Sequence, residues 1–137
     1  MKESVIENYL VERMKSIGAE IRKVKWIGRR GAPDRCVMHK GLTVWIELKA
    51  PNEEAQAHQV REHERMQRAG QTVLIIDSLE KVDQFFEMFK KSSNECPECG
   101  RGMLLFSSHK EKICTDCNLP FDWNLNPGQR PLVQYQR

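Results

Sequence analysis

The sequence predicts an α/β (α+β) domain, with a mixed sheet of about four strands flanked by helices, followed by a small metal-stapled module. A hairpin pattern over residues 35–48 and a strand–helix–strand order over residues 42–76 indicate antiparallel and parallel pairing in one sheet. Four of the five cysteines follow a short polar joint at residues 92–94. We therefore expect a domain over residues 1–91, a cysteine module over residues 94–123 and a C-terminal tail over residues 124–137.

The first predicted element is a helix over residues 4–16. Apolar residues recur there at helical spacing, Ser4 and Glu7 resemble a capping box, and Gly18 marks the end of the helix. The alternation of polar and apolar residues over positions 20–27 predicts a strand. Two glycines and a proline then make residues 28–33 a loop.

The next two apolar runs, residues 35–38 and 42–48, are separated by His39-Lys40-Gly41 and predict a β-hairpin. A turn centred between Lys40 and Gly41 would place Asp34 opposite Glu47, with Cβ atoms about 5 Å apart on one face of the sheet. Lys49 points to the same face, because strand side chains alternate with a period of two.

The remaining elements of the first domain alternate between helix and strand. Residues 53–69 are rich in helix-forming side chains and precede Gly70, so they predict a helix. Residues 72–76 form an unbroken apolar run that fits a central strand buried on both faces. Residues 79–91 predict a last helix, which ends in two lysines that suit a helix C-terminus.

Length and composition exclude several classes of protein. A chain of 137 residues and 16.0 kDa is too short for a large multidomain enzyme, and 39% hydrophobic with 30% charged residues is typical of a soluble globular protein. No apolar run approaches the length of a membrane span, and the first residues lack the apolar core of a signal peptide. We therefore expect an intracellular, cytoplasmic protein that is not secreted.

Positive charge is concentrated in the first third of the chain. Residues 1–50 hold 11 basic and 6 acidic side chains, although the whole chain carries a net charge of only +3. This density suits contact with phosphates, but a solvated basic strand edge explains it equally well. The side chains that we expect to contact DNA are Lys25, Arg29, Arg30 and Arg35.

Two Cys-x₂-Cys pairs, Cys96 with Cys99 and Cys114 with Cys117, are separated by 14 residues. This spacing predicts a zinc ribbon in which four thiolates fill the coordination sphere, so that Zn²⁺ is structural. Two disulfides are the alternative, which a reducing compartment disfavours. The ribbon has three candidate contacts, namely DNA, a partner or its own neighbouring domain. Cys36 is expected to be a small buried hydrophobic residue.

Asp34, Glu47 and Lys49 form the group that indicates catalysis. Two carboxylates at cross-strand distance suit Mg²⁺ or Mn²⁺, which can bind a scissile phosphate and lower the pKa of an attacking water. The Lys49 ammonium could hold that water or stabilise charge on the phosphate. Taken alone, the three residues are also consistent with a surface Glu–Lys pair and an aspartate that caps a turn.

The sequence Gly31-x-Pro33-Asp34, followed by Glu47-Leu48-Lys49, resembles the signature of the PD-(D/E)xK nucleases. More narrowly it resembles the VRR-NUC (virus-type replication-repair nuclease) family, in which a helical Glu precedes these motifs and a Gln lies on the next helix. Glu7 and Gln59 occupy those two places. The resemblance covers about residues 3–91 and leaves out the zinc ribbon.

This resemblance implies a restriction-endonuclease-like fold and a metal-dependent DNA endonuclease of the phage- or bacterium-encoded type. Small members of the family are often homodimers that act on branched DNA, such as four-way junctions, in replication, recombination or repair; no membrane or small-molecule substrate is implied. Asp34, Glu47 and the Leu48 carbonyl would hold Mg²⁺ or Mn²⁺, and Lys49 would position the water. Glu7 would reach a second metal or the water shell of the first, and Gln59 would support the site.

Two other functions fit parts of the sequence. One is a non-catalytic zinc-ribbon protein that binds DNA or assists replication, which the intact acidic and lysine positions argue against. The other is an endonuclease of the HNH type, which needs a histidine-rich strand that is absent here. We expect His58 and His63 to be ordinary surface residues, because their spacing places them on different helix faces. The tryptophans, Trp26, Trp45 and Trp123, are expected to pack rather than to stack on bases.

Overall fold

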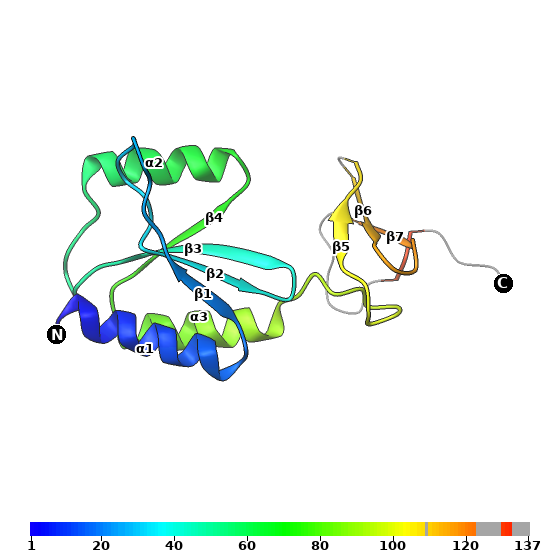
Figure 1. The fold of residues 1–137 in the computed structure, drawn as a ribbon, viewed down its shortest axis with the longest axis horizontal. Helices are drawn as coiled ribbons and strands as arrows, with labels where there is room; N and C mark the ends of the chain where they lie inside the picture. The colour runs from blue at the N-terminus through cyan, green and yellow to red at the C-terminus, as the bar shows by residue number, and fades with distance from the viewer. Residues whose placement is uncertain (109, 123–129, 133–137) are drawn as a thin grey trace. The chain divides into compact units, whose positions relative to one another are not determined.

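The computed structural model describes residues 1–108, 110–122 and 130–132, and the chain divides into two compact units (Figure 1). The first unit spans Met1–Ser92 and the second spans Ser93–Arg137. Trp123 and most of the predicted tail lie outside the described residues. Within the described part of the chain, no helix combines the length and the apolar character that a membrane span requires.

The first unit is a four-stranded mixed sheet with helices on both faces, as predicted. Strands β1 and β2 and strands β2 and β3 are antiparallel, whereas β3 and β4 are parallel and joined through α2, in the strand order β1-β2-β3-β4. Helix α2 covers one face of the sheet, and helices α1 and α3 cover the other (Figure 1). The elements are α1 Glu3–Ser16, β1 Glu20–Lys23, β2 Arg35–His39, β3 Leu42–Leu48, α2 Ala57–Arg68, β4 Thr72–Ile76 and α3 Leu79–Lys91.

The hairpin between β2 and β3 has the predicted register. Its loop is the two-residue turn Lys40-Gly41, and both residues have positive φ angles of 49° and 80°, which is the geometry of the turn that best matches strand twist. Arg35 therefore pairs with Ile46, and the Asp34 amide extends the ladder by donating to the Ile46 carbonyl at 3.0 Å. The turn thus brings the segment around Asp34 alongside the end of β3.

The two faces of the sheet differ in chemistry. Val44, Ile46 and Leu48 point from β3 into an apolar core shared with α1 and α3, whose buried side chains include Leu10 and Phe86. Because strand side chains alternate, Trp45, Glu47 and Lys49 point to the opposite face, beneath α2. The polar residues singled out in the sequence therefore share one face.

Two elements are shorter than predicted. Strand β1 ends at Lys23 rather than residue 27. Beyond Lys23 one more hydrogen bond joins the two strands, from the Val24 amide to the Asp34 carbonyl. The next residue on the β2 side is Pro33, which has no N–H to continue the pairing. Helix α2 begins at Ala57 rather than residue 53. Its first turn is fixed by Gln59, whose Oε1 accepts from the Gln56 amide at 2.9 Å.

The prediction of a central strand at residues 72–76 was wrong. Strand β4 lies at the edge of the sheet, and Ile75 is 42% exposed. Ile75 stays exposed although the crossover helix α2 packs on the sheet. An unbroken apolar run in a sequence therefore does not by itself prove that the strand is buried on both faces.

The second unit is a small antiparallel sheet around the four cysteines. Strands β5 (Leu104–Phe106) and β6 (Glu111–Cys114) form an antiparallel hairpin within the predicted ribbon, and β7 (Pro120–Asp122) adds a third strand that the sequence pattern did not reveal. Phe121 and Leu104 fill its core together with Cys96 and Cys114. The cysteine cluster therefore replaces much of the apolar core that such a small unit lacks.

Gly31 holds the loop between β1 and β2 against α2. It has φ +92°, and a Cβ added there would lie 2.8 Å from the His58 carbonyl oxygen and 2.9 Å from the Glu62 Cβ. Gly28, in the same loop, has a similar φ of +76° but nothing within 4 Å of an added Cβ. A comparison of alanine substitutions at Gly28 and Gly31 therefore distinguishes the cost of a strained backbone from the cost of the close contact with α2.

We predict that Gly31→Ala lowers the free energy of unfolding by about 1–3 kcal/mol more than Gly28→Ala does. Both variants pay the left-handed backbone cost, but only Gly31→Ala pushes the loop away from α2. Urea unfolding monitored by circular dichroism measures the difference. Equal losses in the two variants would show that the loop does not depend on this contact.

Candidate active site

Asp34 lies immediately before β2 and ties that strand to the end of β3. Its Oδ2 accepts a hydrogen bond from the Leu48 amide at 2.7 Å, and the preceding Pro33 is fully buried. The carboxylate is thus fixed on the face that also carries Glu47. This arrangement is the one that the hairpin register predicts.

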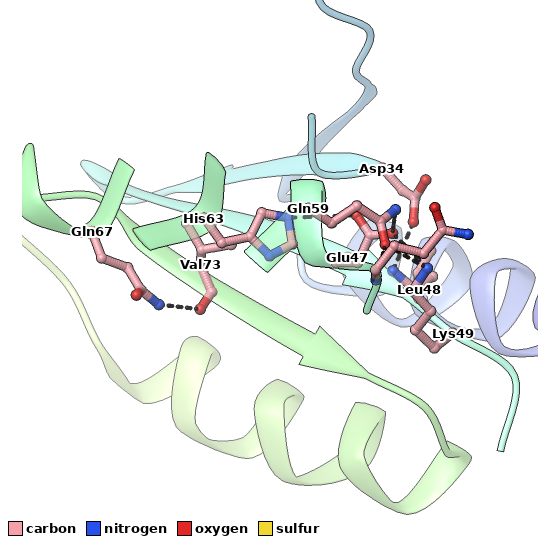
Figure 2. Close-up of polar contacts among 9 residues, drawn as sticks. Asp34, Glu47, Leu48, Lys49, Gln59, His63, Gln67 and Val73 are labelled. Carbon is pink, nitrogen blue, oxygen red and sulfur yellow. Dashed lines mark hydrogen bonds and ion pairs between the residues drawn. The ribbon is translucent and has the colours of Figure 1, made fainter. Parts of the chain in front are cut away.

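Glu47 is the buried centre of the site, with only 2% of its surface exposed. Its Oε1 accepts from Gln59 Nε2 at 3.1 Å and lies 3.4 Å from Lys49 Nζ. Lys49 in turn donates to Gln59 Oε1 at 2.9 Å, so the three side chains form a closed network between β3 and α2 (Figure 2). Gln59 therefore holds the carboxylate and the ammonium in fixed positions. Its Oε1 atom also accepts from the Gln56 amide and so caps the N-terminus of α2.

The pKa of Glu47 is raised to about 7, first by burial and then by the negative charge of Asp34. Lys49 opposes this shift but does not cancel it. A buried carboxylate beside a second carboxylate favours either a proton or a cation. The local electrostatics therefore attract positive charge to the space beside Asp34 and Glu47.

His63 contacts the second oxygen of Glu47. Its Nε2 lies 3.7 Å from Glu47 Oε2, which is beyond hydrogen-bond distance, and within the described residues neither buried atom has a hydrogen-bond partner. Burial lowers the pKa of His63, which favours the neutral imidazole. Figure 2 shows Gln59 and His63 both reaching from α2 towards β3.

The interpretation of His63 as an ordinary surface residue was therefore wrong, since the side chain is buried, whereas His58 is only half-buried. The signal was present in the sequence, because His63 lies four residues after Gln59 and so shares its helix face. The spacing between His58 and His63 does not show this, because the neighbour that matters on the helix face is Gln59.

Asp34 and Glu47 are a suitable donor set for a divalent cation. Both offer hard carboxylate oxygens, which Mg²⁺ and Mn²⁺ prefer, and Glu47 Oε2 is buried without a hydrogen-bond partner among the described residues. A cation there would satisfy that oxygen and reduce the repulsion between the two carboxylates. The residues present therefore fit such an ion.

Glu7 lies on α1 and forms an ion pair with Arg35, whose Nε donates to its Oε2 at 2.8 Å. Among the described residues, no hydrogen bond or ion pair joins Glu7 to Asp34 or Glu47. Glu3, one helical turn before Glu7 on α1, interacts electrostatically with the site. Its pKa is raised by burial and then by the charge of Asp34, with Lys49 opposing.

The basic residues expected to contact DNA divide into two groups. Lys25 and Arg30 are exposed, and Arg29 is half-exposed while its Nε lies 3.3 Å from Glu62 Oε1. Arg35 is largely covered by its pairing with Glu7. The first three side chains are thus the accessible cations of this segment.

The four cysteines of the second unit form a metal-ligating cluster. Their sulfur atoms all lie within 4.8 Å of one another, and two pairs are separated by 3.7 Å. Four ligands about 2.3 Å from a tetrahedral zinc ion would be about 3.8 Å apart, so the observed spacing fits this ion. Backbone amides of Arg101 and Gly102 lower the pKa of Cys99 to about 6, which favours the thiolate that binds metal.

The sulfur of Cys114 also accepts hydrogen bonds from backbone amides. It accepts from the amides of Asp116 and Cys117 at 3.3 and 3.4 Å, as expected for a tight Cys-x₂-Cys turn. A Cβ at Gly102 would collide with this sulfur, so only glycine fits there. Cys36 is buried in β2, as expected.

Comparison with known proteins places this geometry in a family. No protein-family profile matches the chain. The chain is 39% identical over 79 residues to "Putative nuclease p44" of Acyrthosiphon pisum secondary endosymbiont phage 1, an alignment that covers 57% of this chain and 85% of the phage protein. It also resembles a solved structure described as a VRR-NUC domain, with a TM-score of 0.60, 35% identity, and coverage of 64% of this chain and 96% of that one. The chain therefore belongs to the VRR-NUC family of nucleases.

Proposed function

We propose that the protein is a divalent-metal-dependent DNA endonuclease whose active site is formed by Asp34, Glu47, Lys49 and Gln59. The observation that carries this proposal is the buried Glu47 carboxylate beside Asp34. One of its oxygens is held by Gln59 and Lys49, and the other has no hydrogen-bond partner among the described residues. Family membership supports nuclease chemistry, and the site supplies the groups that such chemistry needs.

Asp34 and Glu47 would hold Mg²⁺ or Mn²⁺, together with the Leu48 carbonyl at the end of β3. When bound, such an ion supplies a Lewis acid for a phosphate oxygen and lowers the pKa of an attacking water. Gln59 and the hydrogen bond from Leu48 to Asp34 keep both carboxylates in place before substrate arrives. This preorganisation is what reduces the reorganisation needed during reaction.

Lys49 would position the attacking water and stabilise negative charge on the phosphate. Its ammonium is largely buried and is fixed by Gln59 and Glu47, so it acts from a defined position rather than as a mobile surface cation. Hydrolysis forms a bond from the water oxygen to phosphorus and breaks one ester bond. In this scheme Glu7 contributes from α1 to a second ion or to the water shell.

The substrate would be branched DNA, such as a four-way junction. Lys25, Arg29 and Arg30 lie in the loop that leads to Asp34, so phosphate contacts there would guide the backbone towards the site. One chain offers one such site, and paired cuts at a junction would therefore use a homodimer. Light scattering of the protein bound to a junction tests this, and a monomer that makes paired cuts would contradict it.

We predict that Asp34→Asn, Glu47→Gln and Lys49→Ala each reduce cleavage at least about 100-fold. Asp34→Asn retains an oxygen for the Leu48 amide, so the loss reports charge rather than folding. The assay follows a synthetic four-way junction, a nicked duplex and a linear duplex with Mg²⁺, Mn²⁺ or a chelator.

Glu12→Gln and Lys15→Ala are the matched controls, because both side chains are exposed on α1. They should cleave like the wild type. Wild-type activity in the Asp34 and Lys49 variants would contradict the proposed mechanism. Binding of DNA by the wild type without any cleavage would instead favour a non-catalytic role.

We also propose that Cys96, Cys99, Cys114 and Cys117 bind a structural zinc ion. Purified protein should contain about one zinc ion per chain, and Cys99→Ser should lose it while Cys36→Ala retains it. Elemental analysis measures the metal, and limited proteolysis shows whether the second unit opens when it is removed. If the protein contains no zinc and none of the four cysteines reacts with an alkylating reagent, the cysteines form disulfides instead.

A further inference from the structure

Ile27 is the most exposed large hydrophobic residue in the described part of the chain, at 98%. Burial of an isoleucine side chain stabilises a folded protein, and at this position the folded chain gains almost none of that stabilisation. A single exposed hydrophobic residue is common on protein surfaces. What distinguishes Ile27 is the segment that holds it and the charges beside it.

The loop that carries Ile27 is anchored on both sides. At its base the Val24 amide donates to the Asp34 carbonyl at 2.9 Å, and the Trp26 ring packs on Trp45 with centroids 5.7 Å apart. On the other side Gly31 lies against the backbone of α2, and Arg29 pairs with Glu62. Figure 1 shows this segment, between β1 and β2, running up beside α2. The apolar tip is thus presented by a fixed frame.

The charged residues within the loop segment itself are all positive. Residues 25–31 hold three cations and no acid, and Lys25 and Arg30 are exposed. An apolar partner surface on another protein would not require these neighbouring cations, whereas a nucleic acid offers phosphates to the cations and stacked bases to the isoleucine. Isoleucine is among the side chains that DNA-bending proteins insert between base steps.

Ile27 and the Asp34 carboxylate are also close enough to contact the same DNA molecule. Ile27 precedes Asp34 by seven residues, which can span at most about 25 Å even when fully extended. Base steps rise about 3.4 Å along a strand, so this is no more than about seven steps. A phosphate at Asp34 and a base step at Ile27 can therefore belong to the same duplex arm.

We propose that Ile27 is a wedge that inserts between bases of double-stranded DNA near the scissile phosphate, with Lys25, Arg29 and Arg30 bound to the flanking phosphates. Inserting the wedge costs unstacking energy, which is lowest where bases are already poorly stacked. The wedge would therefore select branch points over uninterrupted duplex. This inference rests on the proposed nuclease function and specifies how its substrate is recognised.

The test compares Ile27→Ser with wild type, using DNA that carries 2-aminopurine at the branch point of a junction or inside a linear duplex. Binding is measured in Ca²⁺ so that it is separated from cleavage. We expect wild type to raise the fluorescence at the branch point severalfold. Ile27→Ser should lose that rise and bind the junction about tenfold more weakly, with less than about a twofold change on linear duplex.

Two matched variants complete the design. Ile27→Leu keeps an apolar wedge and should behave like wild type, whereas Met88→Ser removes another exposed apolar side chain, 63% exposed on α3, and should change nothing. Equal fluorescence and affinity for Ile27→Ser and wild type would overturn the wedge while leaving nuclease activity intact. A fluorescence rise that depends on Ile27, in a protein that cuts no DNA, would support the wedge and contradict the proposed function.

Discussion

The burial of the Glu47 carboxylate beside Asp34 is the constraint around which the first unit is built. An ionised carboxylate removed from water is costly unless it is paired, and here the pairing is only partial. Gln59 and Lys49 satisfy one oxygen, while the other lies 3.7 Å from the His63 Nε2 atom, and the charge of Asp34 acts on the whole carboxylate. Local rules of stability are broken at this point, as is common where a protein binds a ligand or catalyses a reaction.

The sheet makes this arrangement possible because one of its faces is apolar and the other carries polar side chains. The face covered by α1 and α3 supplies the apolar core, which includes Ile46 and Leu48. The face beneath α2 carries the polar side chains, and the loop before Asp34 is fastened to α2 through Gly31 and Arg29. The motif glycine thus serves packing, whereas the aspartate three residues later serves the site. An apolar core on one face therefore stabilises a polar site on the other.

Much of this was predictable from the sequence because it depends on short-range geometry. The two-residue turn at Lys40-Gly41 sets the hairpin register, and strand alternation then aligns Asp34, Glu47 and Lys49. Long-range packing was not predictable in the same way. The edge position of β4 depends on how many strands complete the sheet. The burial of His63 was predictable only through Gln59, whose helix face it shares.

The central claim is that Asp34 and Glu47 share a divalent cation. Anomalous diffraction from a crystal of the protein grown with Mn²⁺ tests it most directly. We expect a manganese peak bonded to a carboxylate oxygen of each residue, with Gln59 and Lys49 still bound to Glu47. A peak elsewhere, or none at a Mn²⁺ concentration that supports cleavage, with Glu47 Oε2 still facing only His63, would contradict it.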